Sequence, residues 1–451
     1  MESLKIGEIA TFCGAKLCGI DPELNVSGIS TDSRTICAGE LFVALRGENF
    51  DGHDYIAKAR ERGAACVLSS RGNIGSGTLE VEDTLLALQQ IAAGYRKKFP
   101  VKVTAITGSV GKTTTKEMTA AVLGVKFNTL KTEGNLNNTI GVPLSVLKLG
   151  REHEAAVFEM GMNHFGEISQ STRAALPDVA VISNIGTAHI EFLGSREGIL
   201  RAKLEIAEGL PEDGVLILNG DEPLLWEKKA GLGFRTVYFG IENENSDIRA
   251  ENIRESTEGS TFDIVCGEGS FSVRVPAAGR HNVMNALAAA AVGREYGMDF
   301  DDVARGLDIF ENVGMRQRIY TKDGYRIIDD CYNANPESMS AALGVLAEVA
   351  EGRKIAVLGD MLELGSYSEQ AHRELGRLAA EKADIIFFFG SEVRFSLEEA
   401  EKSGGCVAEI YDDRERLTWE LMKLAVSGDT VLFKGSRGMK LEEVRKIFCG
   451  E

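Results

Sequence analysis

The apolar positions of this chain form two separate series of strands divided by helices. In the middle of the chain we predict strands at 101–108, 155–162, 178–186 and 214–219 and helices at 164–176 and 195–209. Strands that are apolar throughout and alternate with helices are typical of a parallel sheet covered on both faces. The alternating pattern of 248–275 predicts an antiparallel edge, and the Ala-rich segment 281–297 predicts a closing helix.

The last third of the chain repeats this rhythm independently. We predict strands at 326–330, 354–359, 384–390 and 430–434, and helices at 336–350, 368–382, 392–403 and 412–426. This pattern is typical of a small, doubly wound, Rossmann-like domain.

The first hundred residues follow a different pattern. Short strand-like runs, notably at 40–45, precede a helix over 54–62 and a further apolar run. A helix over 83–98 has a basic end and stops before Pro100, which suits a helix C-terminus and a domain boundary. A length of 451 residues agrees with about three domains. We therefore predict an α/β fold of three domains, namely 1–98, a central parallel-sheet domain at 99–313, and 314–451.

The acidic composition of the chain argues against some classes of binding partner. Lys and Arg number 50 against 68 Asp and Glu, giving a formal net charge of −18. Such a surface repels nucleic acid and anionic membranes, so we expect neither as a partner. No apolar run reaches the roughly 20 residues that span a bilayer, and the first residues show no secretory pattern. The eight scattered cysteines form no C-x-x-C pair, which favours reduced thiols in a cytoplasmic protein over a zinc site.

The strongest motif follows the strand at 101–108 and opens a helix. It comprises Thr107, Gly108, Ser109, Val110, Gly111, Lys112, Thr113 and Thr114. In such a P-loop, backbone N–H groups cradle phosphates at the positive helix end, the lysine reaches the outer phosphates and the threonine can ligate Mg²⁺. Ile106 stands where the general pattern has its first glycine, so a plain strand–turn–helix is the alternative. The motif predicts ATP or GTP binding and leaves the reaction open.

Two further side chains follow strands of the same predicted sheet. Glu159 ends the strand at 155–162, where a carboxylate beside a phosphate loop is well placed for Mg²⁺. The alternative is a surface carboxylate at a strand end. His189 comes just after the next strand and points to the same edge, although a lone histidine is more often a hydrogen-bonded structural residue.

Lys203 interrupts the apolar stripe of the helix at 195–209, which contains Ile199, Leu200, Ile206 and Leu210. The usual explanation is a lysine whose amine reaches solvent along its own alkyl chain. A partly buried lysine instead has a lowered pKa and more neutral amine. Neutral amine could react with CO₂ to give a carbamate, which is an anionic metal ligand.

Together these segments resemble the Mur ligase family, ATP-dependent amide-forming enzymes of peptidoglycan synthesis. The resemblance covers essentially the whole chain and rests on TGSVGKTTTKEM, TEGNLNNTIGVP, FEMGM, NIGTAHIEFLGS, AKLEIAE, GRHNVMNALAA, GMRQR and IDDCYNANPESM, in that order. Within the family, STDSRTICAGELFVALRGENFDGHDY, LGDMLELG and FKGSRGMKLE are most similar to the member that adds D-alanyl-D-alanine to UDP-N-acetylmuramoyl-tripeptide. The absence of a D-N-P-x-R sequence argues against the sibling that adds a diamino acid. The third residue of the tripeptide, meso-diaminopimelate or lysine, stays open.

The resemblance implies a role for each domain and site residue. The first domain would bind the UDP-muramoyl-peptide, the central one ATP with Mg²⁺, and the last one the dipeptide. Lys112 and Thr113 would hold phosphates and Mg²⁺, Glu159 and His189 the metal, and Lys203 would be carbamylated. Further assignments are His281, Asn282 and Asn285 near the adenine; Arg316 and Asp330 toward ATP; Ser33, Arg34, Asn49, Phe50 and His53 at the uridine nucleotide; Asn138 and Thr139 at the muramoyl-peptide; and Asn333, Asn335, Ser338, Lys434 and Arg437 near the dipeptide.

Several alternatives remain open from the residues themselves. Asn335 and Ser338 precede a predicted helix and could simply cap it, and Lys434 and Arg437 could be solvated surface. The nearest rival functions are a sibling Mur ligase or a folylpolyglutamate synthetase-like ligase. A rival of another class is a P-loop regulatory switch or motor. Such proteins usually need a partner, whereas this chain has its own candidate substrate domains. We expect a monomer.

Overall fold

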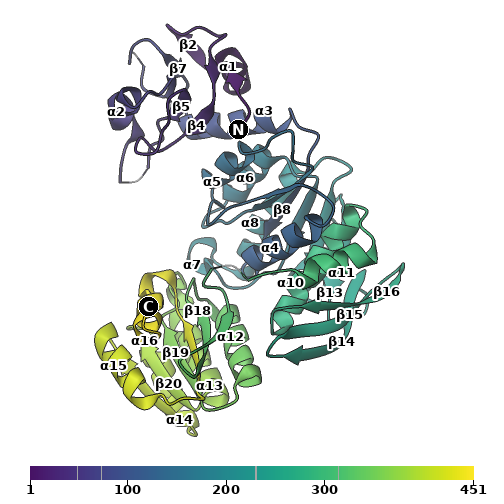
Figure 1. The fold of residues 1–451 in the computed structure, drawn as a ribbon, viewed down its shortest axis with the longest axis vertical. Helices are drawn as coiled ribbons and strands as arrows, with labels where there is room; N and C mark the ends of the chain where they lie inside the picture. Colours follow the sequence, from purple (N-terminus) through teal and green to yellow (C-terminus); the bar gives the residue numbers. More distant parts are fainter. Residues whose placement is uncertain (48, 73, 229–230, 313) are drawn as a thin grey trace.

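The chain folds into three α/β units in sequence order (Figure 1). The computed structural model describes residues 1–47, 49–72, 74–228, 231–312 and 314–451. Its three large sheets lie within residues 16–80, 102–275 and 318–434. The predicted three-domain α/β fold is confirmed, with a parallel-sheet central unit and a doubly wound C-terminal unit. The boundaries at 98 and 313 stay predictions, and Val313 lies outside the described residues.

The N-terminal unit is a small five-stranded sheet in the order β2-β7-β6-β5-β4. Its strands are β2 (Lys16–Cys18), β4 (Gly28–Ser30), β5 (Glu40–Val43), β6 (Cys66–Ser69) and β7 (Thr78–Glu80), and β1 (Leu4–Lys5) pairs separately with β3 (Asn25–Val26). The helices are α1 (Ile6–Cys13), η1 (Gly52–Tyr55), α2 (Ile56–Glu61) and α3 (Thr84–Arg96). The helix predicted over 54–62 is therefore divided between η1 and α2.

Helix α3 belongs to the packing of both the first and the second unit. A Cβ atom on Gly94 would lie 2.3 Å from the ring of Phe12 in α1, so only glycine allows these helices to approach so closely. On its other side α3 packs on α5 (Gly141–Val146) and α6 (Glu167–Ala175) of the central unit. The buried Tyr95 donates its hydroxyl hydrogen to the carbonyl of Leu149 at 2.6 Å. The N-terminal unit is thus attached to the central unit through a helix that both cores share.

The central unit contains a nine-stranded sheet in the order β16-β15-β14-β13-β12-β11-β8-β10-β9. Its strands are β8 (Lys102–Thr107), β9 (Thr129–Lys131), β10 (Ala155–Glu159), β11 (Val179–Ile182), β12 (Val215–Asn219), β13 (Arg235–Gly240), β14 (Ile248–Ser256), β15 (Gly259–Cys266) and β16 (Gly269–Val275). The strands from β9 to β14 are parallel, and β15 pairs antiparallel with both β14 and β16, as the alternating pattern predicted. The short β9 and the strand β13 were not predicted.

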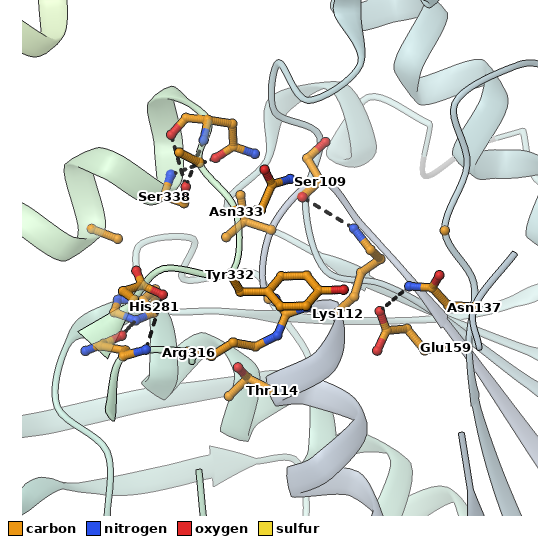
Figure 2. Close-up of a pocket in the computed structure, with 18 of the residues that line it drawn as sticks. Ser109, Lys112, Thr114, Asn137, Glu159, His281, Arg316, Tyr332, Asn333 and Ser338 are labelled. Carbon is orange, nitrogen blue, oxygen red and sulfur yellow. Dashed lines mark hydrogen bonds between the residues drawn. The ribbon is translucent and has the colours of Figure 1, made fainter. Parts of the chain in front are cut away.

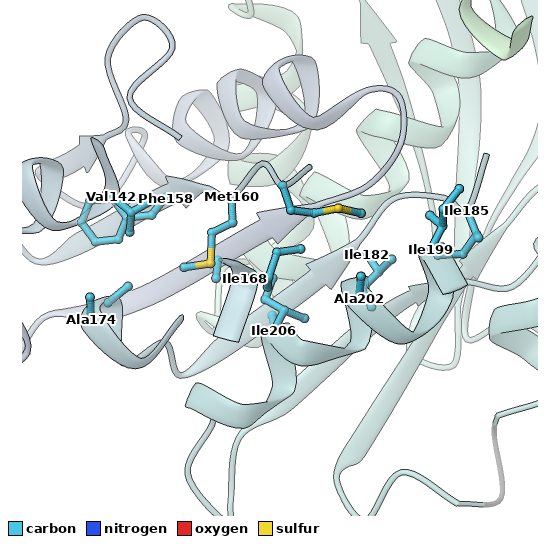
Figure 3. Packing of buried hydrophobic residues seen from close by; sticks show 14 of the residues in the cluster. Val142, Phe158, Met160, Ile168, Ala174, Ile182, Ile185, Ile199, Ala202 and Ile206 are labelled. Atoms are coloured by element: carbon cyan, nitrogen blue, oxygen red, sulfur yellow. The ribbon is translucent and has the colours of Figure 1, made fainter. Parts of the chain in front are cut away.

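Helices cover both faces of this sheet. They are α4 (Lys112–Leu123), α5, α6, α7 (Ile190–Leu193), α8 (Arg196–Leu204) with η2 (Glu205–Gly209), α9 (Pro223–Trp226), α10 (Arg280–Glu295) and α11 (Phe300–Asp308). One core lies under α5, α6 and α8 and includes Phe158, Met160, Ile182, Ile199 and Ile206 (Figure 3). The other lies under α4 and α10. Burial on both faces explains why these strands are continuous apolar runs.

The C-terminal unit is a six-stranded sheet in the order β17-β18-β22-β19-β20-β21. Its strands are β17 (Arg318–Lys322), β18 (Tyr325–Asp330), β19 (Lys354–Gly359), β20 (Ile385–Phe389), β21 (Val407–Tyr411) and β22 (Thr430–Lys434), and only β17 is antiparallel. Its helices are α12 (Pro336–Val349), η3 (Gly365–Tyr367), α13 (Ser368–Lys382), α14 (Arg394–Ser403), α15 (Arg414–Leu424), η4 (Arg437–Met439) and α16 (Leu441–Phe448). No helix among the described residues is long and apolar enough to cross a membrane.

Candidate active site

A cavity of about 440 Å³ lies between the central and C-terminal units (Figure 2). The carboxyl ends of the parallel strands β8, β10 and β11 meet at this edge of the central sheet, which is where open α/β sheets bind ligands. The predicted site residues that line the cavity are Ser109, Val110, Gly111, Lys112, Thr114, Asn138, Thr139, Glu159, His189, His281, Asn282, Asn285, Arg316, Asp330, Asn333, Asn335, Ser338 and Lys434.

The loop between β8 and α4 has the compact turn that its glycines require. Gly111 precedes α4 with φ 83°, and a Cβ atom there would lie 2.5 Å from Oδ1 of Asn285. A Cβ atom on Gly108 would lie 1.9 Å from Oγ of Ser183. Ile106 is a buried residue of β8, so the missing first glycine of the general pattern falls within a strand and leaves the turn intact.

Lys112 is the first residue of α4, directly after this loop, and it lines the cavity. Its Nζ donates to the carbonyl of Gly108 at 2.8 Å. Burial lowers the pKa of Lys112, the charge of Arg316 acts in the same direction, and Glu159 opposes both. Among the described residues no carboxylate forms an ion pair with Lys112, and a partly desolvated cation of this kind is suited to bind an incoming anion.

Residues 183–186, directly after β11, form hydrogen bonds with the phosphate loop. Oδ1 of Asn184 accepts from the backbone N–H groups of Ser109 and Val110, each at 2.9 Å. Ser183 donates its hydroxyl hydrogen to the carbonyl of Val110 at 2.7 Å, and Gly186 N–H donates to Oγ of Ser109 at 2.9 Å. Ser183 and Asn184 were not predicted as site residues. They could have been noticed because they are polar residues at the end of an apolar parallel strand.

Glu159 ends β10, is buried, and is held by three bonds. Its Oε2 accepts from Oγ of Thr113 at 2.8 Å, and its Oε1 accepts from Nδ2 of Asn137 at 2.8 Å. Its backbone N–H donates to Oγ of Thr132 at 3.0 Å. The interpretation of Glu159 as an exposed strand-end carboxylate is wrong. Asn137 was missed as a site residue, although it lies within the segment TEGNLNNTIGVP.

Lys203 lies in α8 and is only 2% exposed, so its amine does not reach solvent. Burial lowers its pKa well below the usual 10.5, and the positive charge of Lys112 lowers it further. The interpretation of Lys203 as a solvent-reaching lysine is therefore wrong. Lys203 does not line the cavity, and its burial favours the neutral amine over the charged one.

His189 caps α7 and faces the C-terminal unit. Its Nδ1 lies 2.7 Å from Oε2 of Glu363, in the loop before η3, and this contact lowers the pKa of the Glu363 carboxyl. Among the described residues no group of three or more His, Cys, Asp or Glu side chains could by itself hold a metal. A metal at this edge would thus depend on Thr113, on ligand phosphates or on a modified Lys203 besides Glu159 and His189.

Helix α10 supplies three polar side chains to the cavity. His281 contacts Oε1 of Gln317 through Nε2, and burial lowers its pKa below the usual 6.5. Asn285 Oδ1 accepts from Oγ of Thr115 at 3.1 Å, which ties α10 to α4. Asn282 donates to the carbonyl of Ala278 at 2.7 Å. Gln317 was not predicted as a site residue, although it is part of the segment GMRQR.

The C-terminal unit contributes two cations and a carboxylate. The guanidinium of Arg316 lies 3.9 Å from the ring centroid of Tyr332, a residue that sequence reasoning missed (Figure 2). Lys434, at 2% exposed, donates to Oδ2 of Asp330 at 2.6 Å and to the carbonyl of Asn333 at 3.1 Å. Lys434 is therefore a buried cavity residue, and the solvated alternative is wrong for it.

Three predicted dipeptide residues have other contacts in this arrangement. Asn335 and Ser338 form a capping box at the start of α12, with Ser338 N–H donating to Oδ1 of Asn335 at 2.9 Å and Asn335 N–H donating to Oγ of Ser338 at 3.0 Å. The capping alternative is confirmed for both, although both also line the cavity. Arg437 is exposed, pairs with Glu442 at 3.0 Å and does not line the cavity.

The five predicted uridine-nucleotide residues all lie in the N-terminal unit, outside this cavity. His53 is buried, its Nδ1 contacts Oδ1 of Asp51 at 2.5 Å, and its Nε2 accepts from Ser70 N–H at 3.1 Å. Arg34 is exposed, and its guanidinium donates hydrogen bonds to the carboxylate of Asp32. Ser33 is buried, whereas Asn49 and Phe50 are exposed. Gly108, Thr113 and Lys203 do not line the cavity directly.

Comparisons with known proteins identify the class that this fold and site define. The chain matches the Mur ligase family catalytic domain over residues 25–96, the Mur ligase middle domain over 106–293, and the Mur ligase glutamate ligase domain over 315–437. The chain belongs to the Mur ligase family.

Particular members of the family are similar over nearly the whole chain. UDP-N-acetylmuramoyl-tripeptide–D-alanyl-D-alanine ligase of Bacillus subtilis is 45% identical over 93% of this chain and 93% of its own length. A crystal structure of MurF from Acinetobacter baumannii superposes with a TM-score of 0.94 at 36% identity and covers 100% of both chains. MurF ligase from Thermotoga maritima, solved in complex with ADP, has a TM-score of 0.85 at 32% identity and covers 94% of this chain and 97% of its own.

Proposed function

We propose that this protein is an ATP-dependent ligase that joins D-alanyl-D-alanine to UDP-N-acetylmuramoyl-tripeptide and releases ADP and phosphate. The observation that carries the proposal is the single cavity where the phosphate loop, Glu159 and two cations of the C-terminal unit converge. The names of relatives that align over more than nine-tenths of the chain support the choice of substrates. ATP and reduced thiols point to the cytoplasm as its compartment, and we expect it to act as a monomer.

Each unit takes one substrate in this proposal. The N-terminal unit binds the uridine nucleotide through the region of Ser33, Arg34, Asn49, Phe50 and His53. The muramoyl-peptide then extends toward Asn138 and Thr139, which lie at the cavity beside the phosphate loop. The C-terminal unit brings D-alanyl-D-alanine near Asn333 and Lys434, whereas the exposed Arg437 contributes only if the units move closer together.

ATP occupies the cavity between the units. Backbone N–H groups of the 108–114 loop and Lys112 hold the phosphates, with His281, Asn282 and Asn285 on the adenine side. Arg316 and Asp330 reach the nucleotide from the C-terminal unit. Phosphoryl transfer depends mainly on positioning and charge neutralisation, which these cations and helix α4 supply.

The residues present fit a magnesium ion beside the phosphate loop. The hydroxyl of Thr113 and the carboxylate of Glu159 are oxygen donors 2.8 Å apart, and Mg²⁺ prefers oxygen ligands. The neutral amine of Lys203 can add to CO₂, forming an N–C bond and releasing one proton, which leaves a carbamate as a further anionic oxygen donor. When bound, Mg²⁺ would neutralise charge on the transferring phosphoryl group.

The reaction then has two chemical steps. An oxygen of the terminal tripeptide carboxylate attacks the γ-phosphorus of ATP, ADP leaves, and an acyl phosphate forms. The free amine of D-alanyl-D-alanine attacks the acyl carbon, the C–O bond to phosphate breaks, and the amine loses a proton. Because an acyl phosphate hydrolyses in water, closure of the two units around the cavity protects it.

The test is phosphate release from ATP with the purified protein and both substrates. We expect release to require D-alanyl-D-alanine and UDP-muramoyl-tripeptide together. Equal release with D-alanine alone, with a folate and glutamate, or with no acceptor would contradict the proposal. Comparing tripeptides that end in lysine and in meso-diaminopimelate identifies the third residue, and light scattering of the same sample tests for a monomer.

A further inference from the structure

We propose that Glu337 is a positioning residue that fixes the phosphate loop of the central unit relative to the C-terminal unit. The inference rests on the proposed function, because its effect is measured in the ligation reaction. Glu337 lies in the first turn of α12, within the segment PESM, and was not among the predicted site residues.

The carboxylate of Glu337 crosses the boundary between the two units. Both of its oxygens accept from the hydroxyl of Thr187, which follows β11 in the central unit, at 3.1 and 3.2 Å. A Cβ atom on Gly186 would lie 2.7 to 2.9 Å from the three carboxylate atoms. The carboxylate therefore rests against the backbone of residues 186–187, and the absence of a side chain on Gly186 makes this contact possible.

Gly186 and the neighbouring Asn184 also contact the phosphate loop. Gly186 N–H donates to Oγ of Ser109 at 2.9 Å, and Asn184, two residues earlier, accepts from two N–H groups of the loop. The carboxylate of Glu337 is thus connected to the phosphate loop through residues 186–187, since Gly186 is bonded to Ser109. Displacing the carboxylate would move residues 186–187 and, with them, Ser109.

A second contact fixes the far end of this segment. Glu363 of the C-terminal unit lies 2.7 Å from Nδ1 of His189, and a Cβ atom on Gly365 would lie 3.1 Å from the side chain of Glu191. Residues 184–191 therefore have the phosphate loop on one side and two carboxylates of the C-terminal unit on the other. This placement lets a shift of the C-terminal unit alter the phosphate loop through residues 184–191.

A plainer explanation for Glu337 is that an acidic residue in the first turn stabilises a helix through its dipole. The two explanations differ for Glu337→Gln. The amide loses the charge that a helix N-terminus favours but still accepts from Thr187. A positioning role therefore predicts that Glu337→Gln stays near wild type and that Glu337→Ala does not.

The experiment measures kcat and KM for each substrate, together with the melting temperature. We expect Glu337→Ala to lower kcat/KM for D-alanyl-D-alanine by about 10-fold, the scale of one lost hydrogen bond, and to raise KM for ATP. KM for UDP-muramoyl-tripeptide should change by less than about twofold, because that substrate is bound mainly by other residues. Glu337→Gln should restore most of the activity. Ser340→Ala, an exposed residue of the same helix, is the matched control.

Two further variants test the route of the effect. Thr187→Val should reproduce the Glu337→Ala loss, and the double variant should lose little more than either alone. Gly186→Ala should impair the wild-type protein because its Cβ displaces the carboxylate, and should add little in the Glu337→Ala background. The inference is overturned if Glu337→Ala matches wild type, if its loss only follows a lower melting temperature with every KM unchanged, or if the Thr187 and Glu337 losses multiply. Absence of dipeptide-dependent turnover in the wild type would instead overturn the proposed function.

Discussion

Thr113 donates its hydroxyl hydrogen to Oε2 of Glu159 at 2.8 Å, which joins the first turn of α4 to the end of β10. Both residues are buried, and Asn137 holds the other carboxylate oxygen. The hydroxyl and the carboxylate are thereby fixed beside Lys112, at the edge of the cavity. This arrangement fixes the orientation of two oxygen donors, as a preorganised metal and phosphate site requires.

Substituting Glu159 should therefore affect metal use more than folding. We expect Glu159→Gln to lower kcat by at least about 100-fold and to raise the Mg²⁺ concentration needed for half-maximal activity, because the amide is a poor metal ligand. Removing Mg²⁺ with EDTA should abolish turnover of the wild type. Glu152→Gln, an exposed carboxylate near the other end of β10, serves as the control. A Glu159→Gln enzyme with wild-type metal dependence would refute the predicted metal role.

Lys203 tests whether its buried amine forms a carbamate. Lys203→Ala should reduce turnover by at least about 100-fold, the scale of a lost charged group at a reaction centre, and added bicarbonate should not restore it. Carbon-13 NMR of wild-type protein with labelled bicarbonate should show a carbamate signal that Lys203→Ala lacks. Arg201→Gln, on the exposed side of the same helix, should remain active. Unchanged activity of Lys203→Ala would exclude the carbamate.

Gln89 tests how the N-terminal unit is attached. Its Nε2 donates to the carbonyl of Thr139 at 3.2 Å and to Oε1 of Gln170 at 3.1 Å, so it links α3 to the segment predicted to bind muramoyl-peptide. Gln89→Leu should lower the free energy of unfolding by about 1–2 kcal/mol and raise KM for the UDP substrate. Urea unfolding and kinetics provide both values, and the exposed neighbour Gln90→Leu should change neither. Equal behaviour of the two variants would mean that this link has no role.

His372 predicts a pH dependence of stability in the C-terminal unit. It is fully buried, its Nε2 accepts from Met361 N–H at 3.1 Å, and burial lowers its pKa below 6.5. Because the unfolded chain then binds more protons in this range, stability rises with pH through the window below about 6.5 and is lost as pH falls.

We therefore expect the free energy of unfolding to decrease between pH 7.5 and 5.5, and the decrease to be smaller by up to about 1 kcal/mol in His372→Gln, which does not titrate. Urea unfolding of both proteins at the two pH values makes the comparison. Identical pH slopes for the two proteins would show that His372 is not responsible.

The sequence predicted most of the fold, because the buried strands of the central and C-terminal units are continuous apolar runs with helices between them. In these two units it missed β13, β17 and β21, which contain exposed and half-buried positions, and β9, which has only three residues. Thr107 to Thr114 and Glu159 could be predicted because strand ends in a parallel sheet converge on one edge. Asn184, Tyr332 and Glu337 could not, since their importance depends on contacts between segments far apart in the chain.

The most direct test of the central claim follows oxygen atoms through the reaction. UDP-muramoyl-tripeptide is prepared with ¹⁸O in both oxygens of its terminal carboxylate and is incubated with ATP, Mg²⁺ and D-alanyl-D-alanine. An acyl-phosphate ligase transfers one labelled oxygen to the released phosphate and leaves the other in the new amide. The account predicts phosphate with one ¹⁸O atom and a product lengthened by the dipeptide. Unlabelled phosphate, or phosphate release without the dipeptide product, would contradict it.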